Sequence, residues 1–299
     1  MLMLALLIVA SSAGAQENDV PDWQKAAGGK MSFDVVSIHK EDLDTPMQNT
    51  IWMMGPDDWY KPSGGRFSGN FVMYSYISFA YKLMMTREQW DVILAQLPKW
   101  VRTDRFSIQA RGPADATKDQ MRLMMQSLLE ERFGLKVHFV TRDEPVFAMV
   151  PVKEGKLGPK LHPHSEGFPC DKTPPDTPSS DPPAVWPRRC DVFQTYASDS
   201  WTMVLAARNT TMDLMAQSLS TWGAVGKPIV NRTGLNDHYD FIIKWFFEFD
   251  GVKPPNDNEA PTPPAFRDAL RDQLGLKLEP ARAPLRVLVV DHIEQPSAN

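Results

Sequence analysis

The chain has 299 residues, of which 42% are hydrophobic and 23% are charged. This length and composition suffice for one large hydrophobic core or two smaller ones. The net charge of -5 and the pI of about 5.7 exclude a generally basic surface, which proteins that bind nucleic acid require. We therefore expect no nucleic-acid partner.

The N-terminus carries an apolar run, Met1–Ala10, followed by Ala13-Gly14-Ala15. This order is typical of the hydrophobic segment and cleavage site of a secretory signal peptide. We predict a signal peptide at residues 1–15, a flexible lead at 16–31, and a protein exported to the periplasm or the cell exterior. A buried N-terminal helix is the alternative. Beyond this run no stretch reaches the ~20 apolar residues of a membrane span, so we predict none in the mature chain.

Hydrophobic periodicity predicts alternating helices and strands in the first half of the chain. The predicted elements are a strand at 33–38, a short strand at 67–70, helices at 72–84 and 86–96, a strand at 105–110, a helix at 117–133, and a hairpin of strands 137–140 and 146–150. Thr117 is a suitable N-cap for the last helix, and Gly134 suits the left-handed position after its end.

A proline-rich segment, residues 153–192, separates the two halves, and Cys170 and Cys190 lie within it. In an exported chain we predict a disulfide between them, which would stabilise the fold by roughly 3 kcal/mol. Two free thiols are the alternative. His162 and His164 have a spacing that allows metal binding, but the sequence identifies no further ligands. We expect exposed loop histidines here, and we predict no metal and no cofactor.

The second half repeats the pattern of the first. The predicted elements are a helix opening at 209–212, a strand at 237–241, a helix at 266–274, and strands at 276–279 and 285–291. In both Leu129–Val137 and Leu270–Leu278, an amphipathic helix ends on glycine and a strand follows. We predict an α+β fold with two related lobes, residues 32–152 and 193–299, each ordered helix, strand, helix, strand, strand. The helices would pack on a largely antiparallel sheet.

Several segments spread over the chain resemble a known family, the soil-associated proteins of Acidobacteria, which are defined by a domain of unknown function. The resemblance spans about residues 32–296, and it rests on Phe33–Ile38, Gly64–Phe67, Leu97–Trp100, Leu128–Lys136, Pro145–Ala148, Lys227–Val230, Thr233–Leu235 and Val287–Pro296, among others. It implies export and, in some members, attachment to membrane metallopeptidases that resemble β-lactam sensors. It supplies no established catalytic residues. This chain has no His-Glu-x-x-His motif.

Ser37-Ile38-His39-Lys40 fits the Ser-x-x-Lys motif of penicillin-recognising enzymes. That chemistry needs the serine at a helix start with the lysine one turn later. Here the segment has a strand pattern, which would direct Ser37 and Lys40 to opposite faces. A serine hydrolase using Ser37 and Lys40 is therefore our alternative. Labelling by a fluorescent penicillin, lost in Ser37→Ala, would establish it.

Aromatic residues on turn-rich segments predict a ligand or partner surface. They are Trp52, Trp59, Tyr60, Phe67 and Trp100. The alternative is that these side chains fold back over the edge of the core. We predict no catalytic residues, and a binding or sensor-like protein with an unknown ligand or protein partner, which a groove between the lobes would hold. A structural or interaction protein of the cell envelope is the second alternative.

Overall fold

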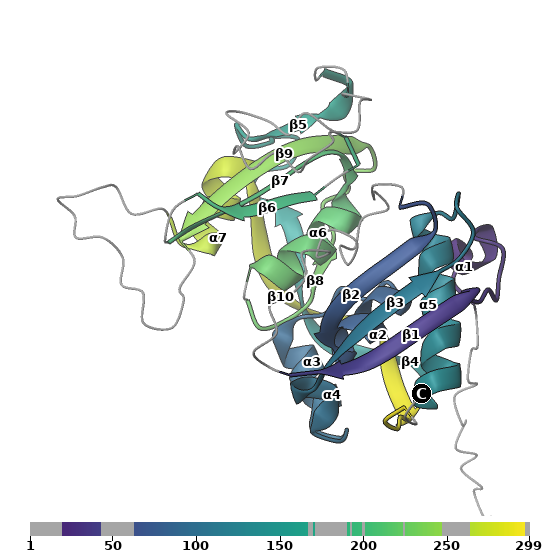
Figure 1. The fold of residues 1–299 in the computed structure, drawn as a ribbon. Coiled ribbons are helices and arrows are strands. Elements are labelled where there is room, and N and C mark those ends of the chain that lie inside the picture. The colour runs from purple at the N-terminus through teal and green to yellow at the C-terminus, as the bar shows by residue number, and fades with distance from the viewer. Residues whose placement is uncertain are drawn as a thin grey trace, which may run out of the picture.

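The computed structural model confirms the predicted α+β fold, with helices packed on largely antiparallel sheets (Figure 1). It describes residues 20–42, 63–166, 170, 190–191, 193–198, 201–223, 225–246 and 264–296. The predicted signal peptide and much of the proline-rich segment lie outside these residues. Within them, no helix combines the length and the apolar character that crossing a membrane requires.

The first sheet is antiparallel with the order β1-β3-β2, so the last of its three strands in the sequence lies in the centre. Its strands are β1 (Val35–Glu41), β2 (Arg66–Val72) and β3 (Arg105–Arg111), and the helices around it are α1 (Asp22–Ala26), α2 (Met73–Ala80), α3 (Arg87–Leu94), α4 (Trp100–Thr103) and α5 (Lys118–Phe133). Thr117 caps α5 in a reciprocal capping box, and Gly134 ends it with a φ of 56°. Both predicted end signals of this helix are thus confirmed.

The second sheet has the order β5-β9-β7-β6 and is also antiparallel. Its strands are β5 (Leu161–Pro163), β6 (Phe193–Ala197), β7 (Thr202–Thr211) and β9 (His238–Phe246); a short 3-10 turn, η2 (His164–Glu166), follows β5, and the helical elements are α6 (Met212–Trp222), α7 (Phe266–Ala269) and η3 (Leu270–Leu274). Residues Tyr239–Ile243 of β9 are buried on both faces of the sheet. This central strand therefore carries the apolar run Phe241–Ile243 instead of an alternating pattern, and its one buried charged residue is Asp240.

Two long strands, β4 (Lys136–Pro151) and β10 (Leu276–His292), connect the two parts of the molecule. They pair with each other in antiparallel register from Leu276↔Pro151 to His292↔Lys136, with one irregularity near the end. The predicted hairpin at 137–150 and the predicted division of 276–291 into two strands are therefore wrong, because each of these ranges lies in one continuous strand. Pro145 is tolerated because β8 (Ile229–Asn231), the parallel partner on the other side of β4, covers only Phe147–Met149.

Each part of the molecule has its own hydrophobic core, and we call each part a lobe. The first core joins the β1-β3-β2 sheet with α2 and α5, and it includes Leu288 from the end of β10. The second core joins β7, β9, α6, α7 and η3, and it includes Phe147 and Met149 from the end of β4. Each long strand therefore begins in one lobe and ends in the core of the other. The predicted lobe boundaries at 152 and 193 assign all of β4 to the first lobe and all of β10 to the second, whereas each strand ends in the core of the other lobe.

Candidate functional site

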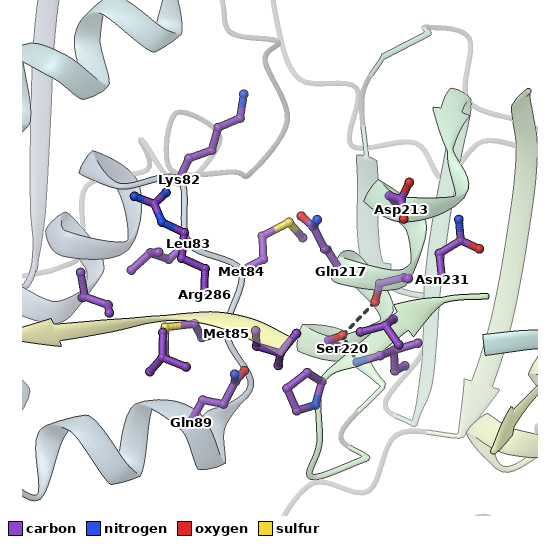
Figure 2. A pocket seen from close by; sticks show the side chains of 17 residues that line it. Lys82, Leu83, Met84, Met85, Gln89, Asp213, Gln217, Ser220, Asn231 and Arg286 are labelled. Atoms are coloured by element: carbon purple, nitrogen blue, oxygen red, sulfur yellow. Dashed lines mark hydrogen bonds between the residues drawn. The ribbon is translucent and has the colours of Figure 1, made fainter. Parts of the chain in front are cut away.

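A cleft of about 340 Å³ lies where the two lobes meet (Figure 2). Three segments line it: the connection between α2 and α3, one face of α6 together with β8, and the part of β10 that crosses between the lobes. The lining residues are Lys82, Leu83, Met84, Met85, Gln89, Asp213, Ala216, Gln217, Ser220, Pro228, Ile229, Val230, Asn231, Leu285, Arg286, Val287 and Leu288. A junction between packed units is a common place for a ligand site.

The first wall is formed by the connection between α2 and α3. Lys82 ends α2 with a φ of 53°, and the backbone N–H of Leu83 donates to the carbonyl of Ser78 at 2.9 Å. The Lys82 ammonium pairs with Asp119 on α5 at 3.5 Å. Thr86 then starts α3 with a reciprocal capping box. The connection is thus held at both ends, and it presents its apolar side chains to the cleft.

The second wall is formed by α6 and β8, which one buried serine ties together. The Ser220 hydroxyl donates to the carbonyl of Ala216 at 2.9 Å and accepts from the N–H of Ile229 at 2.7 Å. Asp213 and Gln217 lie one helical turn apart on the same helix and are exposed at the rim of the cleft. This wall therefore combines an apolar base with a carboxylate and an amide at its edge.

The third side of the cleft is the crossing segment of β10. Leu285, Val287 and Leu288 contribute apolar surface, and the guanidinium of Arg286 lies 3.8 Å from the ring centroid of Phe139. A cation–π contact of this kind orients a guanidinium. The cleft therefore has apolar side chains from all three sides, with Asp213 and Gln217 on the α6 side and Arg286 on β10 (Figure 2).

A second hollow, of about 500 Å³, lies within the first lobe beside α1, α5 and the start of β4. Lys30 pairs with Glu130 at its edge at 2.9 Å, and this hydrogen-bonded contact raises the pKa of Lys30. Burial raises the pKa of Tyr81 to about 12, so this phenol stays protonated. The hollow is lined by residues of one lobe only, and we therefore take the cleft between the lobes as the candidate site.

The aromatic residues predicted to form a ligand surface are separated by the fold. Trp52, Trp59 and Tyr60 lie outside the described residues. Phe67 is 2% exposed and belongs to the first core. Trp100 packs on Phe106 and Phe133, at 5.8 and 6.4 Å between ring centroids. The described aromatics thus adopt the alternative arrangement, in which they cover the core, and neither lines the cleft.

The serine and lysine of the alternative hydrolase do not form a pair. The hydroxyl of Ser37 lies 2.9 Å from Nε2 of His39, and both residues are on β1. The Lys40 ammonium is 2.7 Å from the carboxylate of Asp104. The hydrogen bond from Lys40 lowers the pKa of Asp104. Because Lys40 is engaged there, it is not placed to accept a proton from Ser37.

The predicted disulfide between Cys170 and Cys190 is confirmed, with 5.4 Å between the two Cα atoms. The two nearby histidines differ in their surroundings. His162 is exposed and lies 3.1 Å from the carbonyl of Pro159. His164 is half-buried and pairs with Asp240 at 2.6 Å. The expected exposure therefore holds for His162, although this residue lies on β5 and not in a loop, and the expectation is wrong for His164.

Sequence reasoning missed most of the cleft. Met84 and Met85 are adjacent methionines after a helix, but for methionines in such sequences core packing is the better explanation. The β10 segment was missed because the sequence predicts two separate strands, 276–279 and 285–291, on either side of Pro284. Asp213 and Gln217 had the helical spacing of a common face, yet nothing in the sequence showed what that face meets.

A family model described as "Protein of unknown function (DUF3738)" matches residues 74–293. The matched range includes every residue that lines the cleft. No curated protein and no solved structure matches the chain.

Proposed function

The chain belongs to the DUF3738 family, and we propose that it is an exported, non-catalytic binding protein whose ligand occupies the cleft between the lobes. The observation that carries this proposal is the composition of the cleft: residues of both lobes and of the strand joining them line one cavity. A ligand there would contact both lobes at once. Binding would then stabilise one relative position of the lobes, which is what a sensor-like protein requires.

Two features support export. The apolar run at Met1–Ala10 followed by Ala13-Gly14-Ala15 has the order of a signal peptide. The disulfide between Cys170 and Cys190 is of the kind that persists in oxidising compartments. The resemblance to soil-associated proteins attached to sensor-like membrane peptidases extends the proposal to signalling. A gene for such a peptidase beside the gene for this chain would support that extension.

The chemistry of the cleft favours a small amphipathic ligand. Its walls of leucine, methionine, valine and isoleucine would cover an apolar body. Arg286 would face an anionic group of the ligand, and Asp213 with Gln217 would face a hydrogen-bond donor. Polar contacts at its two ends would orient such a ligand, and the apolar walls would bury the part between them.

The direct test uses 1-anilinonaphthalene-8-sulfonate, a fluorescent probe with apolar rings and one anionic group. We expect about one probe to bind per folded chain with enhanced fluorescence. The variant Gln217→Trp places a large side chain at the rim of the cleft, and we expect it to weaken probe binding at least about 10-fold. Fluorescence titration measures both affinities.

The matched control is Val92→Trp. Val92 lies on α3, is 63% exposed and does not line the cleft. It adds the same side chain to an exposed helical position, so we expect unchanged probe binding. Circular dichroism should show native secondary structure for both variants. Equal binding by Gln217→Trp and the wild type would contradict the proposed site, and would favour an envelope structural role.

A further inference from the structure

A half-buried histidine faces the disulfide on the side of the second sheet opposite the second core. Nε2 of His164 lies 3.7 Å from Sγ of Cys170 and 3.9 Å from Sγ of Cys190. The three possible ligand atoms lie within 4.8 Å of one another. Imidazole nitrogen and cysteine sulfur are the ligands that zinc takes most often in proteins.

The orientation of this imidazole is fixed by a buried carboxylate. Nδ1 of His164 lies 2.6 Å from Oδ1 of Asp240, which is 4% exposed. The other oxygen, Oδ2, accepts from Nε of Arg208 at 2.9 Å. A carboxylate paired with a guanidinium is ionised and can only accept, so Nδ1 of His164 carries the proton. In the neutral imidazole, Nε2 then presents its lone pair to the two sulfurs.

An irregularity in β7 builds this arrangement. The register with β9 shifts between Ala207 and Thr210, and Asn209 adopts a φ of 55°. The bulge directs the backbone N–H of Asn209 to Oδ1 of Asp240 at 2.9 Å, while its side-chain amide donates to Asp191 at 2.6 Å. Asp191 directly follows Cys190 in the chain. Bulges of this kind often re-aim side chains at functional sites.

We propose that the disulfide is the oxidised state of a zinc site, and that reduction lets Cys170, Cys190 and His164 bind one Zn²⁺ with a fourth position open to water. Asp240 would accept the hydrogen bond from Nδ1 of His164 and so orient the ring, as a carboxylate commonly does for a zinc-bound histidine. His162, two residues from His164, is not part of the site, because its ring nitrogen faces the carbonyl of Pro159. This proposal does not depend on the cleft.

The distances suit this metal. Two ligands of a tetrahedral zinc ion, one nitrogen and one sulfur, are roughly 3.6 Å apart when the Zn–N and Zn–S bonds are ideal. The observed distances of 3.7 and 3.9 Å from Nε2 of His164 to the sulfurs are close to that value. Only the sulfurs of Cys170 and Cys190, bonded in the structure, must separate, to about 3.8 Å. Rotation about the cysteine side-chain bonds supplies most of that movement.

The reaction balances with a dithiol as the reductant. The dithiol transfers two electrons and two protons to the bond between Cys170 and Cys190, and it becomes a disulfide itself. Zinc then displaces the two thiol protons, which leave to solvent, and Nε2 of His164 donates its lone pair. Exchange with an external disulfide re-forms the bond between Cys170 and Cys190, reduces that disulfide to two thiols with two protons from solvent, and releases the ion.

The test reduces the purified full chain with a phosphine, removes the excess, and titrates it with Co²⁺ and then Zn²⁺. We expect one Co²⁺ per reduced chain, with a thiolate-to-cobalt charge-transfer band that Zn²⁺ abolishes. The oxidised chain should bind neither ion at this site. His164→Ala should weaken Co²⁺ binding at least about 10-fold, while the matched control His162→Ala should leave it unchanged.

Circular dichroism of each reduced protein separates metal binding from loss of the fold. If reduction loosens the second lobe, Zn²⁺ should restore the native spectrum of the wild type and not that of Cys170→Ser. The proposal is overturned if reduced wild type and His164→Ala bind Co²⁺ equally. It is also overturned if the charge-transfer band is missing, or if Zn²⁺ fails to restore a fold lost on reduction.

Discussion

Tyr76 shows how one side chain joins a helix to the first sheet. Its hydroxyl donates to the carbonyl of Phe106 on β3 at 2.6 Å and accepts from the N–H of Phe71 on β2 at 3.2 Å. Phe71 and Phe106 are direct partners in the β2–β3 pairing, so the hydroxyl bridges the two strands. Burial raises the pKa of Tyr76 and keeps the hydroxyl protonated, as its donor role requires.

Tyr76→Phe should lower the free energy of unfolding by about 1–3 kcal/mol, because it leaves two buried backbone groups without their partner. Tyr74→Phe is the matched control. Tyr74 is on the same helix and packs against Trp90, and the structure shows no hydrogen bond of its hydroxyl to a described residue. Tyr74→Phe should therefore lower the free energy of unfolding by no more than about 0.5 kcal/mol. Urea denaturation measures both, and equal losses would contradict the bridging role.

Residue type alone did not distinguish a core aromatic from a ligand-binding one. Phe67 follows a glycine-rich turn, which is typical of exposed binding segments, yet it lies on β2 with its ring in the core. The cysteines were predictable, because two cysteines around a proline-rich segment leave few pairings. The role of His164 was not predictable, since Asp240 lies 76 residues further along the chain.

At the scale of elements, the sequence predicts both ends of the 117–133 helix correctly, whereas the helix predicted at 72–84 ends at Ala80 and the long strands differ from their prediction. Thr117, Gly134 and Gly275 act locally, so the sequence around them predicted their conformations. The strand pairing of β4 with β10 is a contact between distant segments. A strand tolerates proline where no neighbouring strand needs the N–H that proline lacks. Whether a neighbour pairs at Pro145 depends on distant segments, so the local sequence indicated a turn there.

Gly134, which follows α5, and Gly275, which follows η3, should differ in their tolerance of a side chain. Both adopt left-handed conformations, with φ of 56° at Gly134 and 70° at Gly275. A Cβ at Gly275 would lie 2.6 Å from the backbone nitrogen of Gly158, whereas at Gly134 the nearest atoms belong to the flexible side chain of Glu294. Gly134→Ala should therefore cost about 1–2 kcal/mol from backbone strain alone.

Gly275→Ala should cost at least about 1 kcal/mol more than Gly134→Ala, because the segment containing Gly158 must also move. That segment closes the end of η3, since the N–H of Gly158 donates to the carbonyl of Leu274 at 3.0 Å. Thermal unfolding followed by circular dichroism gives both losses. If Gly134→Ala lost more stability than Gly275→Ala, the prediction would be contradicted, because the segment containing Gly158 would then move without cost.

At the scale of the whole molecule, the long strands explain why the cleft exists. Asp143 and Pro284 face each other in the middle of the β4–β10 pairing, where both strands pass from one lobe to the other. The lobes share this one pair of strands, and the cavity lies beside the strands where the lobes meet.

The sequence predicted two lobes and a groove between them, but the lining depends on the crossing of β10, which local patterns do not encode. The central claim is that this cleft holds a ligand against both lobes at once. Hydrogen exchange on the complex with 1-anilinonaphthalene-8-sulfonate tests it most directly. We expect slower exchange at 82–86 in the first lobe, along α6 in the second, and at 285–288 in β10. Slower exchange confined to one lobe, such as around the hollow beside Lys30 and Tyr81, would contradict the claim.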